Sequence, residues 1–122
     1  MADVTTTVDT YLSAYNEPDA EARLALLQQA FAAGGCLIDP PLGGEGRQGI
    51  SDMMGAVQQQ FPGHRFRRAS GVDEHHGYLR YGWELLDPAG NVALAGMDVG
   101  ELDASSQLLR VTGFFGPLPE IV

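Results

Sequence analysis

Hydrophobic residues repeat with a helical period through the first half of the chain. Recurrence at spacings of three and four places apolar residues on one face of a helix. Three segments show it, and their apolar positions are Val4, Val8, Tyr11, Leu12 and Tyr15; then Leu24, Leu27 and Phe31; then Ile50, Met54, Val57 and Phe61. The first helix is expected to be capped by Asp3 or a nearby Thr. A second should begin around Pro18-Asp19 and continue to Gly34-Gly35, and a third should end before Pro62-Gly63.

From His64 onward the pattern changes to the alternation that is typical of strands. Four segments show it, residues 65–76, 78–86, 92–102 and 108–115, and short turns separate them. Strands joined by such turns should pair antiparallel. Helices followed by this meander predict one domain over residues 1–122, with an α+β fold in which a curved antiparallel sheet has the helices packed on one face.

Composition excludes several kinds of partner. Sixteen acidic residues face seven Arg and no Lys, and the formal charge of −9 disfavours binding to nucleic acid. The only cysteine, Cys36, cannot form an intramolecular disulfide. The N-terminus is acidic and lacks a long apolar segment, so we expect neither a signal peptide nor a membrane span, and a cytoplasmic location.

Two aspartates stand at positions where a charge is costly. Alternation along 92–102 puts Asp98 on a face with aliphatic residues, which should raise its pKa and let it donate a hydrogen bond near neutral pH. Asp39 ends the short apolar stretch 36–38, beside a glycine-rich loop. It should be less enclosed and more readily ionised, so the pair could divide acid and base roles. Alternatively, Asp39 caps local backbone before Pro40, and Asp98 pairs with an Arg on a neighbouring strand.

The opposite face of residues 92–102 is also apolar. It carries Ala93, Ala95, Met97 and Val99. Since monomers rarely expose large contiguous apolar patches, this face predicts a homodimer.

The order of elements, together with a few short motifs, resembles the NTF2-like (cystatin-like) cone fold. The closest resemblance is to its SnoaL-like polyketide cyclase and ketosteroid isomerase branches. The motifs are Thr10-Tyr11-Leu12, Ile38-Asp39-Pro40, Gly49-Ile50, Ala95-Gly96-Met97-Asp98 and the closing segment 110–116. The resemblance implies a curved sheet with the N-terminal helices on its concave face.

The same resemblance implies a site for cofactor-free proton transfer next to a carbonyl. In ketosteroid isomerases an aspartate before a proline moves the proton, while a tyrosine and a protonated aspartate hold the enolate oxygen. Carried over, Asp39 is the base, with Tyr11 and Asp98 as donors. The substrate would be a small hydrophobic carbonyl compound such as a steroid or polyketide.

Further residues complete the predicted site. Tyr15 lies one turn after Tyr11 on the same helical face, so either tyrosine could enter the pocket. The candidate substrate-binding residues are Tyr15, Trp83, His76 and Phe114. The adjacent His75 and His76 should point to opposite faces of a strand, so no metal site is predicted. The alternative function is a non-catalytic binding or dimeric scaffold protein of the same fold.

Overall fold

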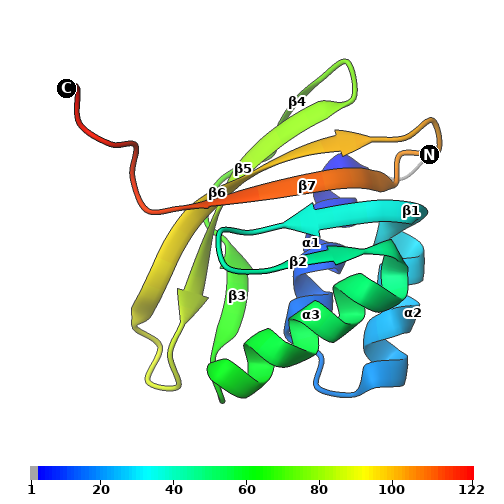
Figure 1. Ribbon diagram of the computed structural model, residues 1–122. Coiled ribbons are helices and arrows are strands. Elements are labelled where there is room, and N and C mark those ends of the chain that lie inside the picture. Colours follow the sequence, from blue (N-terminus) through cyan, green and yellow to red (C-terminus); the bar gives the residue numbers. More distant parts are fainter. Residues whose placement is uncertain (1–2) are drawn as a thin grey trace.

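The computed structural model describes residues 3–122 and contains three helices and seven strands (Figure 1). In chain order these are α1 (Val4–Tyr15), α2 (Ala20–Ala30), β1 (Phe31–Ile38), β2 (Gly43–Glu45), α3 (Gly46–Gln60), β3 (Arg65–Arg68), β4 (Asp73–His75), β5 (Tyr78–Leu86), β6 (Val92–Leu102) and β7 (Leu108–Phe115).

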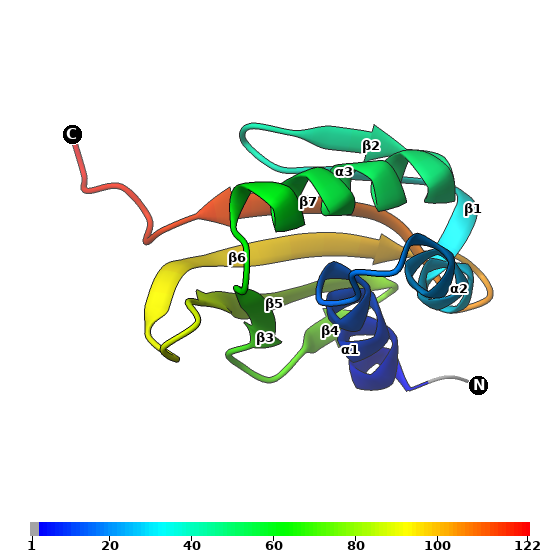
Figure 2. The same ribbon diagram turned by 90° about the horizontal axis from the view of Figure 1, so that it is seen from below.

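All seven strands form one curved sheet, and the helices lie on its concave side (Figures 1 and 2). The strand order is β2-β1-β7-β6-β5-β3, and β4 also pairs with β5. The predicted antiparallel pairing of β5, β6 and β7 is confirmed. β1 differs, because it pairs parallel with β7 and so makes the sheet mixed. The predicted α+β cone is confirmed, and the prediction of a wholly antiparallel sheet is corrected, because β1 and β7 lie far apart in the chain and are not joined by a hairpin.

The second helix is shorter than its apolar pattern suggested. It ends at Ala30, and Phe31 begins β1 with an extended backbone. Phe31 is one helical turn after Leu27, so the spacing alone favours a longer helix. Pairing with β7 overrides that local preference, and the Phe31 side chain is buried in either case.

One strand boundary and one helix cap also differ from the prediction. The segment 65–76 is not one strand but two, β3 and β4, which pair separately with β5. Asp3 occupies the N-cap position of α1 without making a side-chain capping hydrogen bond, whereas the Asp19 carboxylate accepts one from the Ala22 N–H at 2.9 Å and caps α2.

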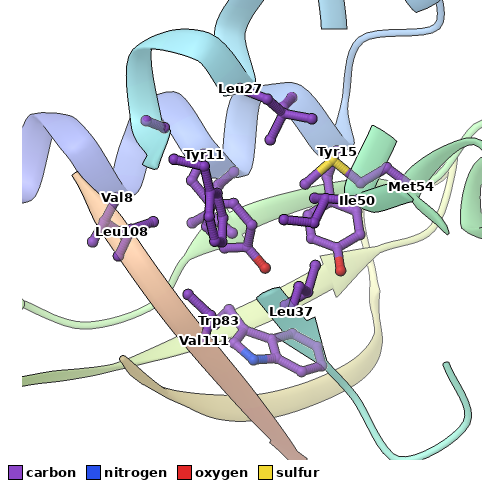
Figure 3. Close-up of a cluster of buried hydrophobic side chains, with 14 of the residues drawn as sticks. Val8, Tyr11, Tyr15, Leu27, Leu37, Ile50, Met54, Trp83, Leu108 and Val111 are labelled. Atoms are coloured by element: carbon purple, nitrogen blue, oxygen red, sulfur yellow. The ribbon is translucent and has the colours of Figure 1, made fainter. Parts of the chain in front are cut away.

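The helices and the inner face of the sheet enclose the core. Figure 3 shows Tyr11 and Tyr15 between Leu27 on the helical side and Trp83 and Val111 on the sheet side. The amphipathic face of α1 is thus buried as its spacing predicted. No helix among residues 3–122 has the length and apolarity needed to cross a lipid bilayer.

Candidate functional site

A cavity of about 200 Å³ lies between the helices and the concave face of the sheet. Its lining is mainly apolar and aromatic and includes two carboxylates. The lining residues are Tyr11, Leu12, Tyr15, Asp39, Pro41, Leu42, Val57, Gln60, Phe61, Phe66, Trp83, Leu85, Leu94, Asp98 and Phe115. Pockets of this composition are typical of small-molecule sites.

Asp98 is held on the inner face of β6 with 4% of its surface exposed. Its Oδ2 accepts a hydrogen bond from the Tyr81 hydroxyl at 2.6 Å, and its Oδ1 accepts one from Trp83 Nε1 at 3.0 Å. Burial raises the pKa of Asp98 to about 7; the Tyr81 hydrogen bond opposes this shift and the nearby Asp39 charge adds to it. These two donors, rather than an arginine, satisfy the carboxylate, so the alternative of an Asp98–Arg ion pair is wrong.

Asp39 follows β1 and is less buried than Asp98, as predicted. Its backbone N–H donates to Leu42 O at 2.8 Å and fixes the turn over the two prolines, while its side chain accepts from the Tyr15 hydroxyl at 3.2 Å. Its carboxylate accepts no backbone hydrogen bond within residues 3–122, so Asp39 is not a local cap. Burial nevertheless raises the pKa of Asp39 above its ordinary value, against the hydrogen bond from Tyr15, so this carboxyl group ionises less readily than its place beside a loop suggested.

Gly113 brings the two carboxylates together. This residue of β7 is the antiparallel partner of Asp98, and the parallel pair Ile38–Thr112 puts Asp39 beside it. A Cβ at Gly113 would overlap Asp39 Oδ1 and would lie 3.1 Å from Asp98 Oδ1. Asp39, just after β1, and Asp98, on β6, therefore face the same small space, which a methyl group at Gly113 would fill.

Both candidate tyrosines line the cavity. Tyr11 and Tyr15 stand one turn apart on α1 with their rings edge-on, 5.6 Å between centroids. Burial raises the pKa of each well above the usual tyrosine range, and the Asp39 charge adds to the shift at Tyr15. Both phenols thus stay neutral and can donate hydrogen bonds at physiological pH. Tyr15 contacts Asp39 directly, so it belongs to the site together with Tyr11.

Two predicted substrate-binding residues lie away from the cavity. Phe114 is 55% exposed on the outer face of β7, and its neighbour Phe115 lines the cavity instead. His76 is exposed in the turn between β4 and β5, with a positive φ of 54° and its ring beside His75. Phe114 points outward because side chains alternate along β7, and His76 is exposed because it lies in the turn at residues 76–77 and not in a strand.

Trp83 is brought into the cavity, as predicted, and has a second role. Its indole N–H donates to Asp98, and its ring lies edge-on to those of Phe66 and Phe115 at centroid distances of 5.5 and 5.7 Å. Sequence reasoning missed Tyr81, the other Asp98 donor. Alternation along β5 could have shown that Tyr81 points inward, because it lies on the same face as Trp83.

No cluster of three or more His, Cys, Asp or Glu side chains suited to a metal ion occurs among the residues that the structure describes. The site consists instead of two carboxylates, three phenols and an indole around an apolar space. Such a set can hold and move protons and can stabilise a developing oxyanion.

Comparison with solved structures gives the family. A protein from Agrobacterium tumefaciens str. C58, provisionally named an isomerase of the SnoaL-like family, is 40% identical, with a TM-score of 0.86 over 92% of this chain and 96% of that one. The chain belongs to the SnoaL-like family.

More distant SnoaL-like and NTF2-like structures share the fold. A protein from Jannaschia sp. CCS1, provisionally named a SnoaL-like polyketide cyclase, is 14% identical with a TM-score of 0.66, over 94% of this chain and 89% of that one. An NTF2-like protein of unknown function from Exiguobacterium sp. 255-15 is 16% identical with a TM-score of 0.70, over 92% and 99%. No family model and no curated protein matches this SnoaL-like chain.

Proposed function

We propose that this SnoaL-like protein catalyses cofactor-free proton transfer next to the carbonyl of a compact hydrophobic substrate. The observation that carries the proposal is the meeting of Asp39 and Asp98 over Gly113, at the wall of an apolar cavity. The two acids differ in burial and in hydrogen-bond donors, which is the condition under which one can act as an acid and the other as a base. The SnoaL-like relative provisionally named an isomerase supports the same reaction class.

In the proposed reaction Asp39 removes a proton from the carbon beside the carbonyl. The electron pair moves to the carbonyl oxygen, and the resulting enolate accepts hydrogen bonds from the Tyr11 hydroxyl and from protonated Asp98. With a pKa of about 7, a large fraction of Asp98 carries a proton near neutral pH. Asp39 then returns its proton to a different carbon, which completes an isomerisation. Alternatively, the enolate carbon attacks a second carbonyl of the substrate and the resulting alkoxide takes the proton back from Asp39, which completes an aldol-type cyclisation.

Tyr81 and Trp83 have positioning roles in this scheme. The indole N–H of Trp83 and the Tyr81 hydroxyl both donate to the Asp98 carboxyl group, so they fix its orientation. Tyr15 orients Asp39 in the same way. Each acid is thus held in place by aromatic donors of its own.

The cavity volume favours a compact substrate. An apolar cavity of about 150 Å³ encloses benzene, and the present cavity of about 200 Å³ is only moderately larger. A compound with one ring and a few substituents fits inside it, whereas a four-ring steroid would extend through its mouth. The substrate class proposed is therefore a small cyclic or cyclisable ketone.

The proposal is tested with a β,γ-unsaturated cyclohexenone, whose isomerisation produces a conjugated enone that absorbs in the ultraviolet. Asp39→Asn should reduce the rate by about 100-fold or more, as expected for loss of a general base. Asp52→Asn, an exposed change on α3, should leave it unchanged. Circular dichroism verifies that each variant is folded.

Binding without turnover is the alternative, and the same experiment separates the two. The only tryptophan, Trp83, lines the cavity, so its fluorescence reports occupancy independently of chemistry. Saturable quenching by the ketone without any enone formation would favour a binding protein and overturn the enzyme proposal.

We also propose that the outer face of the sheet forms a homodimer. Val99 and Phe114 are exposed there next to the outward-facing Ala95 and Met97, and the helices of residues 3–122 all lie on the opposite side of the sheet (Figure 1). Burial of such a patch favours association. Val99→Asp should convert a dimer to a monomer in light scattering, and a wild type that is already monomeric at high concentration would refute the proposal.

A further inference from the structure

A second cavity, of about 470 Å³, lies on the other side of Tyr15 and Phe61, which line both cavities. It is bounded by the turn between α1 and α2, the C-terminal half of α3 and the segment that follows α3. Its lining combines polar and apolar groups, in contrast to the mainly apolar first cavity, and it contains no Asp or Glu. The lining residues are Tyr15, Asn16, Pro18, Arg23, Gly55, Gln58, Gln59, Phe61, Gly63 and His64.

Arg23 is the only residue in this lining whose side chain carries a charge at every physiological pH, and only 6% of its surface is exposed. Nε donates to Ser51 Oγ at 3.0 Å, and Nη1 donates to the backbone carbonyls of Glu17 at 3.0 Å and Pro18 at 3.5 Å. These bonds join the α1–α2 turn to α3. Within residues 3–122 no carboxylate lies within 4.0 Å of the guanidinium, although buried charges are normally paired.

The second terminal nitrogen of Arg23, Nη2, lies next to Gly55. Nη2 takes part in none of the hydrogen bonds among residues 3–122. Every fully buried side-chain nitrogen in these residues has a hydrogen-bond partner, so Nη2 must be accessible to solvent. Gly55 lies directly over it, and a Cβ at that position would be 3.1 Å from Nη2. The glycine therefore keeps the approach to a buried cation open.

We propose that this second cavity binds a small organic carboxylate, with Nη2 of Arg23 donating to a carboxylate oxygen. A monoanion fits better than a phosphate dianion, because one nitrogen is free and the chain carries a net charge of −9. The aromatic and proline side chains of the wall suit the apolar part of the ligand, and Gln59 and His64 at the edge offer further polar contacts. The site shares Tyr15 and Phe61 with the wall of the proposed catalytic cavity, but acetate binding at Arg23 can be measured without any catalytic activity.

Acetate is the probe, and the amide signal of Gly55 and the Nε–H signal of Arg23 in ¹⁵N-labelled protein are the readouts. Titration at constant ionic strength with chloride should shift both signals saturably. Gly55→Ala should weaken acetate binding by about ten-fold or more, because its Cβ covers Nη2 and removes a charge-assisted hydrogen bond. This change replaces a helical glycine by alanine and leaves the Nε and Nη1 bonds in place, so folding is retained.

Gly71→Ala is the matched control, since nothing lies within 4 Å of a Cβ there, and its acetate affinity should equal that of the wild type. Equal affinity in Gly55→Ala and wild type, or shifts in wild type that stay linear with acetate, would overturn the proposal. Inorganic phosphate forms the second arm at the same ionic strength, and tighter binding of phosphate than of acetate would overturn the choice of a carboxylate.

Discussion

The pKa of Asp98 makes the stability of the protein depend on pH in an unusual direction. Most native carboxylates have lowered pKa values and stabilise the fold as the pH rises. Asp98 has a raised one, from 3.8 to about 7, mainly through burial. The folded protein therefore retains a proton that the unfolded chain has released. This contribution is complete below pH 3.8 and is lost as the pH rises through 7.

The size of the effect follows from the shift. Each pKa unit corresponds to about 1.4 kcal/mol, so Asp98 should lower the free energy of unfolding by about 4 kcal/mol between pH 4 and 8. That is a large part of the total stability of a domain, which is about 5–15 kcal/mol. The raised pKa of Asp39 acts in the same direction.

Asp98→Asn isolates this contribution. The amide oxygen can accept from Trp83 and the amide nitrogen can donate to the Tyr81 oxygen, so the variant keeps both partners and carries no charge. Urea unfolding of both proteins from pH 4 to 8 gives the free energies. Other groups largely cancel in the difference, so wild type should lose about 4 kcal/mol relative to the variant across this range.

Asp52→Asn on the exposed side of α3 provides the control and should follow the wild-type curve. If wild type and Asp98→Asn instead give parallel curves, Asp98 titrates alike in the folded and unfolded states. The neutral-donor role proposed for it would then be untenable, whatever its distance from Asp39.

Two further changes test the geometry around the acids. Gly113→Ala should displace the Asp39 carboxylate and reduce turnover by about 100-fold, whereas Gly82→Ala, which meets only ordinary contacts in β5, should leave turnover unaltered; equal rates in the two variants would contradict the shared space. Trp83→Phe removes a hydrogen bond that lowers the pKa of Asp98, so the Asp98 carboxyl signal in a carbon-detected NMR titration should move to a higher pKa, and an unchanged midpoint would refute this role.

Local sequence patterns were sufficient for most of the fold. The helical spacing of α1 and the alternation of β5, β6 and β7 reflect burial on one face, and burial is what these patterns report. These patterns gave the wrong element where pairing with a strand far away in the sequence determines the local structure. Phe31 continues the apolar spacing of α2, and only its pairing with β7, about 80 residues later in the chain, makes it the start of a strand.

The position of Asp98 among its donors depends on a feature that alternation does not show. Leu86 pairs with Val92 across the turn, but Leu85 pairs with Leu94, so the register shifts by one residue. This irregularity places Tyr81 directly opposite Asp98. Without it Tyr81 would oppose Met97, and a slip of one residue exchanges the two faces of a strand. The inward directions of Asp98 and Tyr81 were predictable from alternation, but the register that sets them opposite each other was not.

The meeting of the two acids likewise depends on pairing and not on local sequence. Asp39 reaches the site through the parallel β1–β7 pair, and Asp98 reaches it through the antiparallel β6–β7 pair. Both pairs meet at Gly113. The side chains of Asp39 and Asp98 point inward over this residue, so any side chain at position 113 would occupy the space of a carboxylate. A glycine at this inner position of β7 is therefore as necessary to the proposed chemistry as the acids themselves, although it carries no functional group.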